Sequence, residues 1–232
     1  MNLTIDLAPI AVALDGPDLS TITSWASAVD GVVSTVKVGL ESYLRDGASG
    51  VAEIRAATPH SALFLDLKLH DIPATVAGAC RSVAGLAPDI LTVHAAGGPE
   101  MVAAAVAALP TTLVAAVTVL TSLNAQMIAA LGFQGTPREC VIRLATLAVD
   151  AGATALVCSP QEVGEVRAAV GSDVLLITPG VRPAGAATND QQRVATPQQA
   201  LADGANLLVI GRPITGAASP RDAATAIATS LR

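Results

Sequence analysis

The segment Ala62-Leu63-Phe64-Leu65-Asp66-Leu67-Lys68-Leu69-His70-Asp71-Ile72-Pro73-Ala74-Thr75-Val76-Ala77 joins an apolar stretch to an Ala-rich one through three charged residues. Residues 62–67 predict a β-strand, and residues 74–86 have the spacing of a helix. The strand is almost continuously apolar, which is typical of a parallel sheet covered on both faces. This unit decides the fold because it recurs along the chain.

Eight strands and eight helices are predicted from this pattern. The strands are expected at residues 9–14, 34–38, 62–67, 90–93, 113–120, 155–158, 174–177 and 206–210. The helices are expected at residues 19–29, 42–57, 74–86, 100–109, 137–151, 161–170, 197–202 and 220–231. Eight β/α units predict a (β/α)8 TIM barrel of the α/β class, with a doubly wound open sheet as the alternative. No linker or shift in composition divides residues 1–232, so we expect a single domain.

The composition argues against several classes of protein. A net charge of −6 with one Trp, one Tyr and two Phe lacks the basic, aromatic surface that binds nucleic acid. No apolar run reaches the length of about 18 residues that a membrane span needs, and residues 1–6 do not resemble a signal peptide. Three widely spaced cysteines argue against a disulfide framework or a structural zinc site. We expect a cytoplasmic protein that binds neither nucleic acid nor membrane.

Polar residues gather where the predicted strands end. Barrel enzymes build their active sites at the C-terminal ends of the strands. The residues at these ends are Asp15, Lys37, Asp66 with Lys68, His94, Thr121 with Ser122, Ser159, Thr178, and Gly211 with Arg212. We therefore expect a functional site at this rim.

Four of these residues alternate in charge, namely Asp15, Lys37, Asp66 and Lys68, with Asp71 nearby. Side chains alternate along a strand, so Asp66 and Lys68 should point the same way. Neighbouring opposite charges keep each other ionised, which suits Lys68 to donate a proton rather than to form a Schiff base. One alternative is a structural ion pair. Another is a metal site of Asp15, Asp66 and His94, in which Lys68 would compete with the cation; His60, His70 and His94 are otherwise expected to be surface or structural residues.

The other half of the rim has features of a phosphate site. Gly211 allows close backbone approach and Arg212 supplies a fork of donors, at the place where barrels often bind phosphate. Arg182 follows the seventh strand, and the polar stretch to Gln191 is a loop that can close over a ligand. An ordinary solvated loop is the alternative.

The segment Asp66–Pro73 resembles the signature segment of the orotidine 5′-monophosphate decarboxylase family. Further matching segments are residues 13–15, 37–39, 93–98, 117–122, 178–183 and 209–213, so the resemblance extends across the chain. Two departures are mild: Leu69 stands where an aromatic residue is common, and Ala74 where Asn is common.

The resemblance implies a reaction and its chemistry. The expected activity is decarboxylation of a small nucleotide, orotidine 5′-monophosphate, to UMP and CO2, the final step of de novo pyrimidine synthesis, without cofactor or metal. It implies that Lys68 is the proton donor in a tetrad with Lys37, Asp66 and Asp71. It also implies a homodimer with shared sites, because Asp71 and Thr75 reach the neighbouring subunit's site in this family.

The resemblance also assigns substrate contacts. Asp15 and Lys37 are expected at the ribose, and Thr121 and Ser122 at the pyrimidine ring. The phosphate is expected to contact Arg182, Gln191, Gly211 and Arg212. The whole signature segment is expected to line the substrate site: Asp66, Leu67, Lys68, Leu69, His70, Asp71, Ile72, Pro73, Ala74 and Thr75.

Two rival functions remain. Metal-dependent sugar-phosphate barrels, such as 3-keto-gulonate-phosphate decarboxylase or hexulose-phosphate synthase, share the Asp-x-Lys-x-x-Asp pattern. The continuation His70–Pro73 and the loop 180–191 favour the nucleotide enzyme. The other rival is a non-catalytic nucleotide-binding barrel, against which the intact set of charged residues argues.

Overall fold

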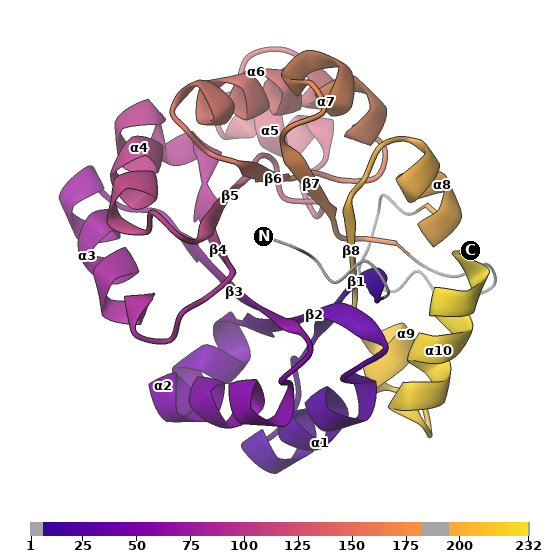
Figure 1. Ribbon diagram of the computed structural model, residues 1–232. Coiled ribbons are helices and arrows are strands. Elements are labelled where there is room, and N and C mark those ends of the chain that lie inside the picture. Colours follow the sequence, from indigo (N-terminus) through magenta and orange to yellow (C-terminus); the bar gives the residue numbers. More distant parts are fainter. Residues whose placement is uncertain (1–6, 182–194, 232) are drawn as a thin grey trace.

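The computed structural model describes residues 7–181 and 195–231, which form a closed barrel of parallel strands surrounded by helices (Figure 1). The strands are β1 (Ala8–Ala13), β2 (Val33–Gly39), β3 (Ala62–Leu69), β4 (Ile90–His94), β5 (Leu113–Val117), β6 (Ala155–Val157), β7 (Leu175–Thr178) and β8 (Leu207–Ile210). They pair in chain order, and β8 pairs with β1 to close the ring. The predicted (β/α)8 barrel is confirmed, and the alternative of an open sheet is wrong.

The helices lie outside the strands, as the sequence pattern predicts (Figure 1). They are α1 (Leu19–Val29), α2 (Leu40–Ala57), α3 (Pro73–Ala84), α4 (Pro99–Ala108), α5 (Ala125–Ala130), α6 (Pro137–Asp150), α7 (Val163–Val170), α8 (Pro197–Ala202), α9 (Arg212–Thr215) and α10 (Pro220–Ser230), with a 3-10 turn η1 (Ala95–Gly97). The turn η1 and the helices α5 and α9 are not predicted from the sequence. The turn η1 and the helix α9 have three and four residues, too few to show a helical period.

Strand β5 is the one strand whose predicted end differs by more than two residues. The apolar run continues to Leu120, but β5 ends at Val117. Val119 and Leu120 are apolar for another reason, since both line the cavity at the mouth of the barrel. The apolar wall of a cavity therefore imitates, in the sequence, the pattern of a buried strand.

Two apolar cores hold the barrel together. The larger lies between the strands and the helices and includes Ile10, Leu65 and Leu91. The smaller fills the barrel interior and consists of Ala11, Phe64, Ile90, Ala115, Ala155, Ile177 and Leu207. These inward side chains come from both odd-numbered and even-numbered strands, as in other barrels of this kind. The interior is therefore packed below the rim, and a ligand can enter only from an end.

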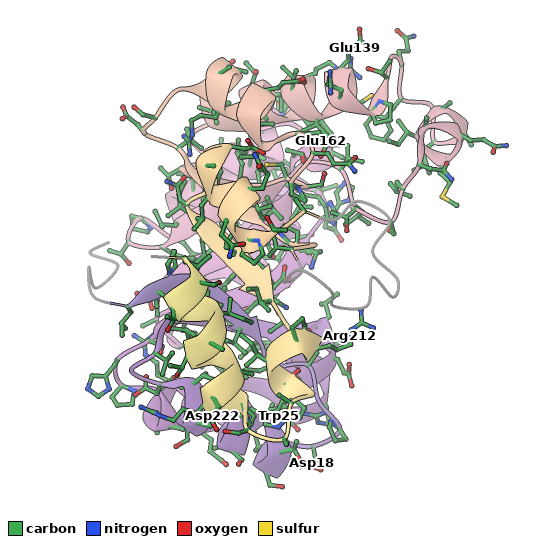
Figure 2. The ribbon with its side chains drawn as sticks, turned by 90° about the vertical axis from the view of Figure 1, so that its right-hand side faces the viewer. Asp18, Trp25, Glu139, Glu162, Arg212 and Asp222 are labelled. Atoms are coloured by element: carbon green, nitrogen blue, oxygen red, sulfur yellow. The ribbon has the colours of Figure 1, made fainter. Side chains whose placement is uncertain are left out.

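Polar side chains cap the N-termini of several helices. Asp18 accepts a hydrogen bond from the backbone N–H of Thr21 at 2.8 Å before α1, and this bond helps to lower the pKa of Asp18. Thr136 and Glu139 form a reciprocal capping box at α6. Figure 2 shows Asp18 and Glu139 at the outer edges of the molecule. These caps fix the N-terminal ends of the helices.

Over residues 7–181 and 195–231, no helix combines the length and the apolar character needed to cross a membrane. The three cysteines are buried and unpaired. The cytoplasmic location expected from the sequence stays a prediction.

Candidate active site

Charged residues on β2 and β3 meet Asp15, which follows β1, at one rim of the barrel. The ammonium Nζ of Lys37 lies 3.6 Å from Asp15 Oδ2 and 3.2 Å from Asp66 Oδ2. The ammonium of Lys68 donates to the other oxygen of Asp66, Oδ1, at 2.8 Å. The register between neighbouring strands explains why these side chains come together: Ala13 of β1 pairs with Lys37 of β2, and Gly39 of β2 pairs with Asp66 of β3. The structure thus brings Asp15, Lys37, Asp66 and Lys68 together in the alternating order expected.

Asp66 is the centre of this array, and its side chain is only 13% exposed. Burial by itself raises the pKa of Asp66, but the charges of Lys37 and Lys68 outweigh burial and hold that pKa below its ordinary value. Asp66 is therefore an ionised carboxylate at neutral pH. Lys37 and Lys68 are the only two lysines of the chain, and both bind this one carboxylate.

A cavity of about 190 Å³ opens beside Asp66 and Lys68. Thr121 adds a hydroxyl to its wall, and the remaining lining is largely apolar: Phe64, Val117, Val119, Leu120, Val157, Cys158, Ile177, Pro179 and Val209. Burial raises the pKa of the Cys158 thiol to about 12, so this group is a neutral part of the wall. The arrangement places a lysine ammonium at the edge of an apolar pocket.

This apolar lining was not predicted from the sequence. The sequence does contain a signal for it: residues near the C-terminal ends of the strands that point inward must line the mouth of the barrel, so the apolar ones predict an apolar lining. Thr92 was also missed. It is a buried polar residue within the apolar strand β4, and its hydroxyl contacts Asp66.

Two histidines, His70 and His94, lie close to each other near the charged residues. The rings of His70 and His94 lie 5.3 Å apart, and His70 is exposed. Burial lowers the pKa of His94, and the nearby His70 and Lys68 lower it further, so His94 is neutral at neutral pH.

The metal alternative finds no support in the geometry. Both oxygens of Asp66 are taken by lysines. In the part of the chain that is described, no three His, Cys, Asp or Glu side chains come together as a group that could hold a metal ion. The expectation that the reaction needs no cofactor stays a prediction.

The signature segment divides into two parts. Leu67 and Leu69 pack into the core between strands and helices, not into the cavity. The following residues His70, Asp71, Ile72, Ala74 and Thr75 are exposed, and Pro73 begins α3. Asp71 accepts from the backbone N–H of Ile72 at 2.7 Å, and among the described residues it forms no ion pair with either lysine of its own chain. The expected tetrad is therefore incomplete within one subunit.

The expected phosphate end lies where β8 runs into α9. Gly211 precedes this short helix, and Arg212 opens it with an exposed side chain at the edge of the molecule (Figure 2). A Cβ added to Gly211 would meet Ala13 Cβ at 3.5 Å, an ordinary contact, so the protein's own packing does not require a glycine. Ser122 is exposed just beyond Thr121. Arg182 and Gln191 lie outside the described residues.

Known proteins resemble the chain over nearly its whole length. The model of the "Orotidine 5'-phosphate decarboxylase / HUMPS family" matches residues 8–227. Proteins named orotidine 5'-phosphate decarboxylase from Thermobifida fusca and Frankia casuarinae are 67% and 53% identical, each covering 97% of this chain and 96% and 88% of their own lengths. A crystal structure of orotidine 5'-phosphate decarboxylase from Lactobacillus acidophilus superposes with a TM-score of 0.84 at 33% identity, covering 97% of this chain and 99% of its own. The resemblance drawn from the sequence is confirmed: this chain is a carboxy-lyase that belongs to the orotidine 5′-phosphate decarboxylase family.

Proposed function

We propose that this chain converts orotidine 5′-monophosphate to UMP and CO2, with Lys68 as the proton donor. The observation that carries the proposal is the Lys68 ammonium, which is held 2.8 Å from an ionised Asp66 at the wall of an apolar cavity. The family places the reaction as the last step of pyrimidine nucleotide synthesis.

The chemistry requires a fixed cation beside the reacting carbon. When the bond from C6 of the pyrimidine to the carboxylate breaks, CO2 leaves and the electron pair stays on C6. No carbonyl is placed to delocalise that pair, so stabilisation must come from a preorganised positive group. Lys68 supplies the charge and then gives one proton to C6, and the neutral amine regains a proton from water. Asp66 holds the ammonium in place through Oδ1.

The cavity gives the substrate an orientation. Its volume of about 190 Å³ is below the range of about 300–1,000 Å³ of pockets that enclose a whole ligand, so we infer that it takes the pyrimidine, with Thr121 and the neighbouring Ser122 at the ring. Asp15 and Lys37 then face the ribose. The phosphate lies toward Gly211 and Arg212, where the room left by the glycine suits a ligand, with Arg182 and Gln191 as further partners. Phosphate contacts far from C6 supply binding energy for the reacting end.

We further propose a homodimer with shared sites. Asp71 and Thr75 are exposed in a single subunit, and Asp71 does not bind the lysines of its own chain, which suits a role in the partner's site. The apolar side chain of Ile72, next to Asp71, is 66% exposed, and that of Leu44 on α2 is 78% exposed. A second subunit covering them would remove this apolar surface from water.

The direct test follows loss of the orotidylate absorbance with purified protein and no added metal. Turnover is expected and should survive EDTA, since the proposed cation is a lysine. Loss of activity in EDTA that returns with a divalent cation would instead support a metal-dependent sugar-phosphate enzyme. Binding of UMP without any turnover would support the non-catalytic nucleotide-binding barrel.

Gly39→Ala is expected to weaken substrate binding without unfolding the protein. An added Cβ would lie 2.6 Å from Asp15 Oδ1 and 3.1 Å from Lys37 Nζ, so these side chains must move apart. Both are flexible ends, and Gly39 has a negative φ that alanine tolerates. We expect KM to rise about tenfold, as for one lost charge-assisted hydrogen bond, with an unchanged melting temperature. Gly85→Ala, where no atom lies within 4 Å of the new Cβ, is the control; equal KM values in the two variants would contradict the prediction.

A further inference from the structure

Thr92 lies on β4, fully buried, and contacts the rim of β3 twice. Its hydroxyl oxygen accepts the backbone N–H of Lys68 at 2.9 Å. The same hydroxyl donates its proton to Asp66 Oδ1 at 3.0 Å. One side chain thus holds both the backbone that carries Lys68 and the carboxylate that binds the Lys68 ammonium.

The pairing of β3 with β4 shows why this side chain is needed. Leu65 pairs with Leu91 and Leu69 pairs with Val93, so three residues of β3 lie opposite Thr92 alone. Lys68 has a φ of +48°, in the left-handed region that residues with a Cβ rarely adopt. Such a conformation persists only where the surroundings hold it. The ordinary ladder is interrupted here, and the Thr92 hydroxyl provides the acceptor for the Lys68 N–H.

The hydroxyl also completes the bonding of Asp66. Oδ1 receives both Lys68 Nζ and the Thr92 hydroxyl, and Oδ2 receives Lys37 Nζ. A hydroxyl has one proton to donate and lone pairs to accept, so Thr92 can serve both partners at once. Three directions of approach then fix the plane of the carboxylate.

We propose that Thr92 is a positioning residue that determines the position of the Lys68 ammonium. It does so by holding both the Asp66 carboxylate and the β3 bulge, the three residues 66–68 that lie opposite Thr92. The inference rests on the proposed function, in which Lys68 protonates the pyrimidine. It goes beyond that function because Thr92 does not line the cavity and belongs to a neighbouring strand.

Two other buried threonines, Thr118 and Thr35, do not share this arrangement. The Thr118 hydroxyl donates to the backbone oxygen of Val157 at 2.9 Å, which satisfies it without any charged partner. Thr35 on β2 is equally buried, and its hydroxyl lies 3.2 Å from that of Ser34. Thr35 is therefore the matched control, because replacing it by valine makes the same chemical change away from Asp66.

The experiment compares Thr92→Val, Thr92→Ser and Thr35→Val in the full chain. Valine keeps the shape and removes the hydroxyl, whereas serine keeps the hydroxyl. For Thr92→Val we expect kcat to fall at least about tenfold, the factor that corresponds to about 1.4 kcal/mol, while KM stays within about threefold because the phosphate contacts are intact. Thr92→Ser should restore most of kcat, and Thr35→Val should leave kcat at the level of the unsubstituted chain.

A second measurement does not depend on turnover. Hydrogen–deuterium exchange at the Lys68 amide, in protein without ligand, should accelerate in Thr92→Val and stay slow in Thr92→Ser and Thr35→Val. Unchanged kcat or unchanged exchange in folded Thr92→Val overturns the inference, as does failure of serine to rescue. An unsubstituted chain that shows no turnover overturns the proposed function instead, and the exchange comparison still decides whether Thr92 holds the Lys68 backbone.

Discussion

Lys68→Ala is expected to lower kcat by about 10⁴-fold or more, because the substitution removes both the proton donor and the cation that stabilises the C6 carbanion. Affinity for UMP should change much less, since the phosphate and ribose contacts involve other residues. The measurement pairs single-turnover kinetics with UMP titration. Near-normal turnover in Lys68→Ala would remove Lys68 from the mechanism.

Lys68→Arg separates the two roles of the lysine. The guanidinium keeps the positive charge but does not release a proton at neutral pH. A large loss in this variant as well assigns the proton donation to Lys68, whereas substantial activity would mean that charge alone suffices.

An independent check uses the fact that the chain has only two lysines. The side chain of Lys37 is 8% exposed and that of Lys68 is 30% exposed, so of the two lysines an amine-directed reagent should modify Lys68 first. Bound UMP should protect it. Mass spectrometry of the labelled peptide reports the site directly.

Asp71→Ala is expected to abolish turnover in its own homodimer, yet to regain activity when mixed with Lys68→Ala subunits. If each site uses Lys68 of one chain and Asp71 of its partner, a mixed dimer has one complete site. Random assortment of equal amounts makes about half of the dimers mixed, each with one working site of two, so about one quarter of the normal activity should return.

The control for this experiment mixes Lys68→Ala with Asp66→Ala. These residues bind each other within one subunit at 2.8 Å, so every mixed dimer lacks one of them at each site and no activity should return. Recovery in the control, or none with Asp71→Ala, would contradict a site shared in this way. The oligomeric state itself is read by sedimentation of the unsubstituted chain.

The sequence predicted the barrel and much of its rim for a clear physical reason. Apolar runs reveal strands buried on both faces, and the periodic segments between them reveal helices that cover them. Asp66 and Lys68 are two residues apart at the end of one predicted strand, so the sequence predicted that both point the same way. The short helix α9 could not be predicted, because four residues show no helical period.

Other features depend on how distant segments meet. The contact of Asp15 with Lys37 depends on the register between β1 and β2, and the bonds from Thr92 depend on an interruption of the ladder between β3 and β4. Shifting either pairing by one residue would turn these side chains to the opposite face. A sequence read strand by strand does not contain that information.

By itself, then, the sequence determined the eight strands, the eight helices that alternate with them into a barrel, and which charged residues stand at the strand ends. The tertiary structure decided that both lysines converge on Asp66, that Thr92 supports the bulge carrying Lys68, and that an apolar pocket lies beside them. The reason is that local periodicity is encoded in neighbouring residues, whereas the position of a proton donor is set by register and closure between strands that are distant in the chain.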